Sequence, residues 1–221
     1  CVKDKVCEHP KAAPKDAYGV CSWWLTFGDD AQEVDATDPP SPSHLALPMN
    51  CVSRIEAQVF AKWAGGRLPT IEEWRCAASG DTEPSITQKS QSKDLETPLY
   101  PWGSQVPTCK LAVMYEDSPA CDGEKRPHPV CSRPLGLSQD GVCDLAGNVW
   151  EWTSDWYNIN YYRDCLKNGF INNPQGAKKA FNPNNPYIQE KVIRGGSFLC
   201  NASYCASYRV SSRMATDPHT S

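Results

Sequence analysis

The chain lacks several patterns that would assign it directly to a class. No apolar run reaches the roughly 18 residues of a membrane-spanning helix, and no unit of roughly 20–50 residues repeats. Net charge is −4, from 22 Lys and Arg against 26 Asp and Glu, and the basic residues are scattered. This distribution argues against a nucleic-acid groove and against binding to an anionic membrane surface. No low-complexity linker interrupts the 221 residues, which favours one domain over two.

The chain has only four histidines and no Cys-x-x-Cys pair, although it has twelve cysteines. The histidines are dispersed, at no spacing typical of a zinc site or of a Cys–His nucleophile. The same dispersion argues against the histidine triad of a non-heme iron enzyme. Twelve cysteines are many for a reducing cytosol, so we expect an extracytoplasmic protein that is periplasmic, on the cell surface or secreted.

No signal peptide is visible, and the first residue is Cys1. A leader removed upstream would fit this start, and Cys1 would then be able to carry a lipid anchor as the first residue of a mature lipoprotein. The alternative interpretation is a chain that starts inside a domain.

Short cysteine spacings predict two disulfides, Cys109–Cys121 and Cys131–Cys143. Both close intervals of twelve residues in a proline-rich stretch, where loop closure should stabilise by about 2–4 kcal/mol. Nineteen prolines, fourteen glycines and eight tryptophans likewise indicate a loop-rich fold. Its stability should depend on aromatic burial and cross-links more than on long regular elements.

Two helices are expected in the first half of the chain. A capping-box pattern at Ser53 begins an amphipathic run, which the glycine pair 65–66 ends. The same pattern at Thr70 begins a second helix that runs to about Ala78.

Strands are expected near the end of the sequence, which makes the class α+β. Val192 and Ile193 predict a strand over 191–198, and the alternation that starts at Tyr208 predicts another over 208–212. Elsewhere the composition predicts loops, turns or a surface insertion, over residues 1–50, 79–140, 145–157 and 158–190.

Hard oxygen donors gather in the stretch Asp-Leu-Ala-Gly-Asn-Val-Trp-Glu-Trp at 144–152. Asp144 and Glu151 supply carboxylates, and the Gly147-Asn148 turn between them can direct several carbonyls inward. Calcium takes about six to eight such oxygens. By spacing alone, the stretch is better interpreted as a turn with two solvated carboxylates.

Cys200 and Cys205 lie five positions apart, shortly after the glycine pair 195–196. On a helix the two side chains would be roughly 140° apart, and on a strand they would lie on opposite faces. The backbone must therefore bend if the two sulfurs converge. A converged pair would form either a small disulfide loop or a two-thiolate metal site.

Four strings in order resemble the formylglycine-generating enzyme (sulfatase-modifying factor) family: WAGGRLPTIEEW, YPWG, DLAGNVWEWTSDWY and VIRGGSFLCNASYC. They extend over roughly three quarters of the chain. The resemblance implies a formylglycine-generating-enzyme fold that is related to C-type lectins, disulfide-rich and low in regular secondary structure. It also implies one domain over 1–221 that is incomplete at both ends, because the family's closing Gly-Phe-Arg segment is not reached.

The resemblance implies a copper site. Active members oxidise a cysteine in a Cys-x-Pro-x-Arg motif to formylglycine with dioxygen, and two cysteines that match Cys200 and Cys205 hold their Cu(I). Soft thiolates suit this ion. The family's active-site serine, tyrosine and tryptophan match Ser197, Tyr204 and Trp150, with the first two orienting groups by hydrogen bonds and the third lining the pocket.

The resemblance also favours calcium in the acidic stretch. The family's calcium loop matches Asp144 and Glu151 through their side chains, and Leu145, Gly147 and Val149 through their carbonyls.

Two positions depart from the family pattern. Asn201 stands where a histidine often follows the first cysteine, and Ala206 stands where an arginine follows the second. Two functions therefore stay open. One is a copper-dependent oxidase that acts on a protein or peptide substrate. The other is a non-catalytic exported module that binds within an extracytoplasmic protein assembly, with Cys200 and Cys205 as a structural disulfide.

Overall fold

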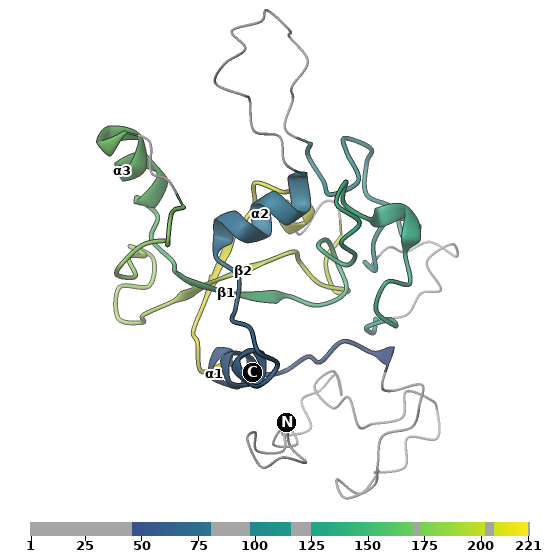
Figure 1. Ribbon diagram of the computed structural model, residues 1–221, viewed down its shortest axis with the longest axis horizontal. Helices are drawn as coiled ribbons and strands as arrows, with labels where there is room; N and C mark the ends of the chain where they lie inside the picture. The colour runs from purple at the N-terminus through teal and green to yellow at the C-terminus, as the bar shows by residue number, and fades with distance from the viewer. Residues whose placement is uncertain (1–45, 81–97, 116–124, 170–172, 202–205, 221) are drawn as a thin grey trace, which may run out of the picture.

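The computed structural model describes residues 46–80, 98–115, 125–169, 173–201 and 206–220 (Figure 1). Regular elements are few among these residues, as the composition predicts. They are the helices α1 (Arg54–Trp63), α2 (Ile71–Ser79) and α3 (Tyr161–Asn168), the strands β1 (Glu151–Trp156), β2 (Lys191–Arg194) and β3 (Met214–Thr216), and two short 3-10 helices, η3 (Pro134–Gly136) and η4 (Ala206–Tyr208). None of the described helices has the length and apolar character that crossing a membrane requires.

Both predicted helices are present and begin as predicted. The Ser53 hydroxyl accepts from the Glu56 amide, and the Glu56 carboxylate accepts from the Ser53 amide at 2.7 Å. Thr70 caps α2 with the same reciprocal pair of bonds. At the end of α1, Gly65 takes φ +82°, a left-handed conformation that stops the helix.

The three strands form one antiparallel sheet in the order β1-β2-β3. In the register of β1 and β2, Glu151 lies opposite Arg194. Helix α2 packs on β1, and α3 lies at the periphery (Figure 1). The Ile71 amide at the start of α2 donates to the Asp155 carboxylate of β1 at 2.9 Å, which fixes the helix to the sheet.

The predicted strand over 191–198 is shorter than expected. It ends at Arg194, because Gly195 and Gly196 take φ +90° and +82° and turn the chain out of the sheet. All four residues of β2 are buried. The glycine pair is therefore the boundary between the sheet and the loop that carries Cys200.

The predicted strand over 208–212 is wrong. A 3-10 helix occupies Ala206–Tyr208, and the third strand lies further on, at β3. The backbone groups of Val210 bond to other partners: its amide donates to the Leu99 carbonyl at 2.9 Å, and its carbonyl accepts from the Arg194 guanidinium. These non-local partners replace the strand ladder that the alternation suggested.

Two regular elements lie where turns or a loop insertion were expected. Strand β1 follows the turn within 145–157, and α3 lies within 158–190. The insertion is anchored rather than separate, because Asn182 and Asn185 donate to the Glu190 carboxylate at 2.7 and 2.9 Å.

The Cys131–Cys143 disulfide is confirmed, with the two Cα atoms 5.2 Å apart. Cys109 is disulfide-bonded, but Cys121 lies outside the described residues, so that pairing stays a prediction. In the described part of the chain Cys76 and Cys165 are free thiols.

Buried apolar residues form two clusters. One joins the end of α2 to Leu145 and Val210. The other, which we call the Cys200 cluster, has a core of Cys109, Met114, Ala146, Cys200 and Tyr208. Both include residues from distant loops, so packing between loops stabilises much of this fold.

Candidate functional site

Asn148 joins the acidic stretch to three other loops. It is fully buried, in the left-handed region at φ +57°. Its side chain donates to the His128 carbonyl at 3.2 Å and accepts from the His128 amide at 3.1 Å. Its backbone donates to the Val113 carbonyl and accepts from the Phe198 amide, both at 2.8 Å. The loop 144–151 is therefore held directly against the loop that carries Cys200.

Glycines in both loops, Gly147 in one and Gly195 and Gly196 in the other, make this approach possible. The Gly147 amide donates to the Gly195 carbonyl at 2.9 Å. A Cβ on Gly147 would lie 2.3 Å from the Val113 carbonyl oxygen, and one on Gly196 would lie 3.1 Å from the Tyr208 ring. The backbones therefore approach closely here, and a side chain at Gly147 or Gly196 would press on the neighbouring loop.

Cys200 is buried beside a serine hydroxyl. The residue is 5% exposed, and the Ser197 hydroxyl lies 3.9 Å from the Cys200 sulfur. The Cys200 carbonyl accepts from the Tyr115 amide at 2.8 Å and from the Tyr208 hydroxyl. Tyr208 also donates to the Ser197 carbonyl at 3.2 Å. These bonds fix the backbone on both sides of the sulfur.

Aromatic rings line the same place. Trp150 packs against the Cys200 cluster together with Tyr100 and Trp102, whose rings stack at 5.3 Å. The structure thus brings together three residues that the sequence singled out: Cys200, Ser197 and Trp150. The other two, Cys205 and Tyr204, lie outside the described residues.

Cys200 is disulfide-bonded in this structure. A sulfur in a disulfide is not a thiolate and cannot serve as a soft metal ligand. Metal binding at Cys200 therefore requires reduction first.

Glu151 is a carboxylate in an unfavourable setting for its charge. Burial, with a contribution from the nearby charge of Asp144, raises its pKa to about 7, although the Trp74 indole and Arg194 act in the opposite direction. The Trp74 Nε1–H donates to the Glu151 carboxylate. On its other side, the Trp74 ring carries the Arg194 guanidinium at 4.2 Å. The α2 helix thus positions Glu151 through one tryptophan.

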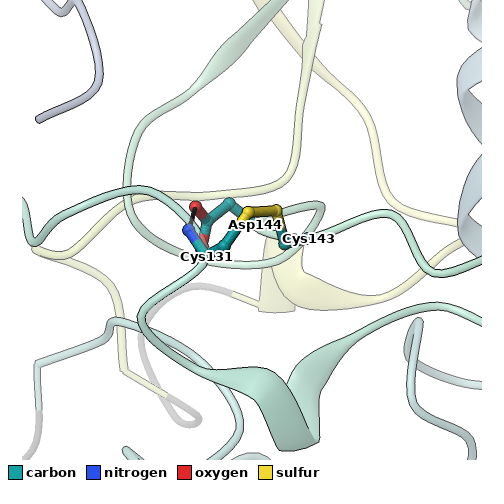
Figure 2. Close-up of side chains that lie close together, drawn as sticks. All are labelled: Cys131, Cys143 and Asp144. Atoms are coloured by element: carbon teal, nitrogen blue, oxygen red, sulfur yellow. Dashed lines mark hydrogen bonds between the residues drawn. A yellow bond between two sulfur atoms is a disulfide. The ribbon is translucent and has the colours of Figure 1, made fainter. Parts of the chain in front are cut away.

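Asp144 lies beside the Cys131–Cys143 disulfide (Figure 2). Its Oδ2 accepts from the Cys131 amide at 2.8 Å. Within the described residues, these three form the one group of Cys, His, Asp or Glu side chains close enough to share an ion. The two sulfurs are bonded to each other, so the arrangement positions Asp144 and is not itself a metal centre.

The acidic loop fits calcium by its donors. The carbonyls of Leu145, Gly147 and Val149 accept no hydrogen bond from the described residues. Asp144 and Glu151 form no ion pair with a described Lys or Arg. Two carboxylates that interact electrostatically, in one loop with three carbonyls that no described donor bonds, supply the hard oxygens that calcium prefers.

Sequence reasoning missed the structural roles of Asn148, Tyr208 and Arg194. The Gly-Asn dipeptide at 147–148 did signal a turn, and asparagine tolerates the left-handed region. No local pattern could have indicated that the Tyr208 hydroxyl bonds to the backbone of Cys200, because no short motif links residues eight positions apart.

Comparison with known proteins identifies the family of the chain. A sequence model of the family described as Sulfatase-modifying factor enzyme 1-like domain matches residues 4–221. The formylglycine-generating enzyme of Streptomyces coelicolor is 34% identical over 189 residues, which cover 81% of this chain and 50% of that protein. The formylglycine-generating enzyme of Mus musculus is 27% identical, over 97% of this chain and 52% of that protein. The chain thus spans about half the length of these relatives.

The chain is also similar to proteins that are not named formylglycine-generating enzyme. The hercynine oxygenase of Mycolicibacterium thermoresistibile is 38% identical over 107 residues, which cover 48% of this chain and 20% of that protein. Among solved structures, PvdO from Pseudomonas aeruginosa superposes with a TM-score of 0.51 at 21% identity, over 79% of this chain and 58% of that one. This likeness concerns the fold.

Proposed function

Because the chain belongs to the Sulfatase-modifying factor enzyme 1-like domain family, we propose that it is a copper-dependent oxidase of the formylglycine-generating type. It would convert a peptide cysteine to formylglycine with dioxygen. The observation that supports this most is the setting of Cys200, a buried sulfur with the Ser197 hydroxyl at 3.9 Å and an aromatic wall beside it. The names of the relatives favour oxidase-type chemistry in general.

Each residue of the site has a part in the proposal. Cys200 holds Cu(I) together with Cys205, the partner that the family resemblance indicates. The Ser197 hydroxyl donates toward sulfur and orients the bound thiolate, and Tyr204 is assigned the same task by resemblance. Trp150 excludes water from the pocket.

Bound copper would supply the affinity for a substrate thiolate and the capacity to reduce dioxygen. The disulfide at Cys200 is then the resting state that reduction must open. Tyr208 should preserve the geometry through this change, because its bond to the Cys200 carbonyl involves the backbone and not the sulfur.

Calcium is proposed in the loop of Asp144, Leu145, Gly147, Val149 and Glu151. A cation there would neutralise two carboxylates whose mutual repulsion contributes to the raised pKa of Glu151. Because Asn148 joins this loop to Phe198, calcium would stabilise the loop of Cys200 without touching substrate.

We further propose an extracytoplasmic location, on the basis of five described cysteines that are disulfide-bonded. The substrate would be a protein or peptide, in keeping with the relatives named formylglycine-generating enzyme. We also propose that the fold is related to that of C-type lectins.

The alternative is a non-catalytic binding or assembly module, and the disulfide at Cys200 is the observation that favours it. The experiment is to reduce the native protein, add Cu(I), and incubate with oxygen and a Cys-x-Pro-x-Arg peptide. Mass spectrometry should show conversion of the peptide cysteine to an aldehyde, absent in Cys200→Ser. A reduced, copper-loaded protein that modifies no cysteine peptide would favour the binding module.

A further inference from the structure

A cavity lies between α2, α3 and the end of β2, outside the Cys200 cluster and the loop 144–151. Its volume is about 850 Å³. Arg75 of α2, Arg194 of β2 and several residues of α3 line it, among them Tyr162, Cys165 and Leu166. No lining residue belongs to the Cys200 cluster or to the loop 144–151.

Arg194 is a buried cation that stacks on the Trp74 ring but has few hydrogen-bond partners among the described residues. The residue is 2% exposed, and its guanidinium donates one hydrogen bond, to the Val210 carbonyl. Its Nε is buried without a hydrogen-bond partner, and no described carboxylate forms an ion pair with it. Burial lowers the pKa of Arg194 to about 10, so it stays charged at neutral pH. A buried guanidinium in this state favours an added anion.

The charges around the cavity also favour an anion. Arg75 is the second cation in the wall, and it donates to Glu72 at 2.7 Å, so the one described carboxylate of the lining is already paired. Arg213 lies 4.8 Å above the Tyr162 ring and adds a third positive charge nearby. The remaining wall includes apolar surface from Leu166, Pro174 and Val210.

We propose that this cavity binds a small carboxylate that carries an apolar or aromatic body. The carboxylate would face Arg194, whose planar fork matches two coplanar oxygens, and the apolar body would lie against α3. This site is independent of the proposed copper chemistry, because it shares no residue with it.

The two free thiols of the described chain provide the test. Cys165 lines the cavity, whereas Cys76 is exposed and outside it. The native protein is alkylated with iodoacetamide in the presence of benzoate, and each cysteine is followed by peptide mapping. Benzoate should slow alkylation of Cys165 and leave Cys76 unchanged. Benzamide, the neutral counterpart, should need concentrations at least about ten-fold higher for the same protection.

A matched pair of variants at one exposed position tests whether the bound ligand is negatively charged. Leu166 is 85% exposed, so its replacement should not disturb the fold. Leu166→Glu should weaken protection by benzoate and Leu166→Lys should strengthen it, each by about two- to five-fold at low salt.

The source of the carboxylate is decided in the same assay. Protection by acetyl-Ala-Phe with a free C-terminus, and not by its amide, assigns the site to peptide ends. Protection by benzoate but not by the peptide acid assigns the site to free small acids. Either result supports the proposal. Equal protection by benzoate and benzamide, or no protection of Cys165 beyond that of Cys76, overturns it.

Discussion

Asn148→Ala is the substitution that most directly tests how the site is held together. The side chain is fully buried and makes two hydrogen bonds to the backbone of His128. Each lost bond should cost about 1 kcal/mol, because His128 is only half-buried and water can reach part of its backbone. Alanine at φ +57° should cost about 1 kcal/mol more. We therefore expect a loss of about 3 kcal/mol in the free energy of unfolding.

For a chain of this length, such a loss corresponds to a fall of about 6–12 °C in melting temperature. Thermal and urea unfolding of the oxidised protein measure it. Asn148→Gly separates the two contributions, since glycine accepts the left-handed region and loses only the hydrogen bonds, about 2 kcal/mol. Asn158→Ala is the matched control, because that side chain also bonds to backbone groups, at 2.9 and 3.2 Å, but at a more exposed position.

The reasoning would be refuted in either of two ways. One is an Asn148→Ala protein that melts within about 1 °C of the wild type. The other is an Asn148→Gly protein that is less stable than the alanine variant, which would mean that the backbone conformation contributes nothing.

Three further predictions concern the same region. Calcium removal by excess chelator should lower the melting temperature, and Glu151→Gln should reproduce the fall; an unchanged curve after confirmed metal removal would contradict the calcium loop. Replacing Cys131 and Cys143 together by serine should lower stability by about 2–4 kcal/mol in urea unfolding, and an unchanged midpoint would show that the cross-link is unimportant. Tyr208→Phe should cost about 1–2 kcal/mol, because the Cys200 carbonyl loses its hydroxyl donor; a neutral result would remove Tyr208 from the account of the site.

The parts of the fold that were predictable are those fixed by neighbouring residues. The caps at Ser53 and Thr70 depend on a glutamate three positions away, and both capping boxes formed. Strand β1 could not be predicted, because its residues are recognised as a strand only through their pairing with β2, about forty positions later. The wrong prediction of a strand over 208–212 has the same origin. The Val210 carbonyl accepts a hydrogen bond from Arg194, a distant residue, and not from a neighbouring strand.

The candidate site divides in the same manner. The family resemblance indicated Cys200, Ser197 and Trp150, and the structure places them together. The resemblance did not indicate what holds them there. Asn148 does so by joining its own loop to three others, and that arrangement forms only when all four loops are in place.

The central claim is that the Cys200 thiolate binds Cu(I), and copper stoichiometry of the reduced protein tests it most directly. Native protein is reduced without denaturation, titrated with Cu(I) against a competing chelator, and compared with Cys200→Ser and Cys165→Ser. The account predicts one Cu(I) per chain with high affinity, lost in Cys200→Ser and retained in Cys165→Ser, since Cys165 is a free thiol outside the Cys200 cluster. No bound copper after confirmed reduction, or equal binding by Cys200→Ser, would contradict the claim and leave the binding module as the function.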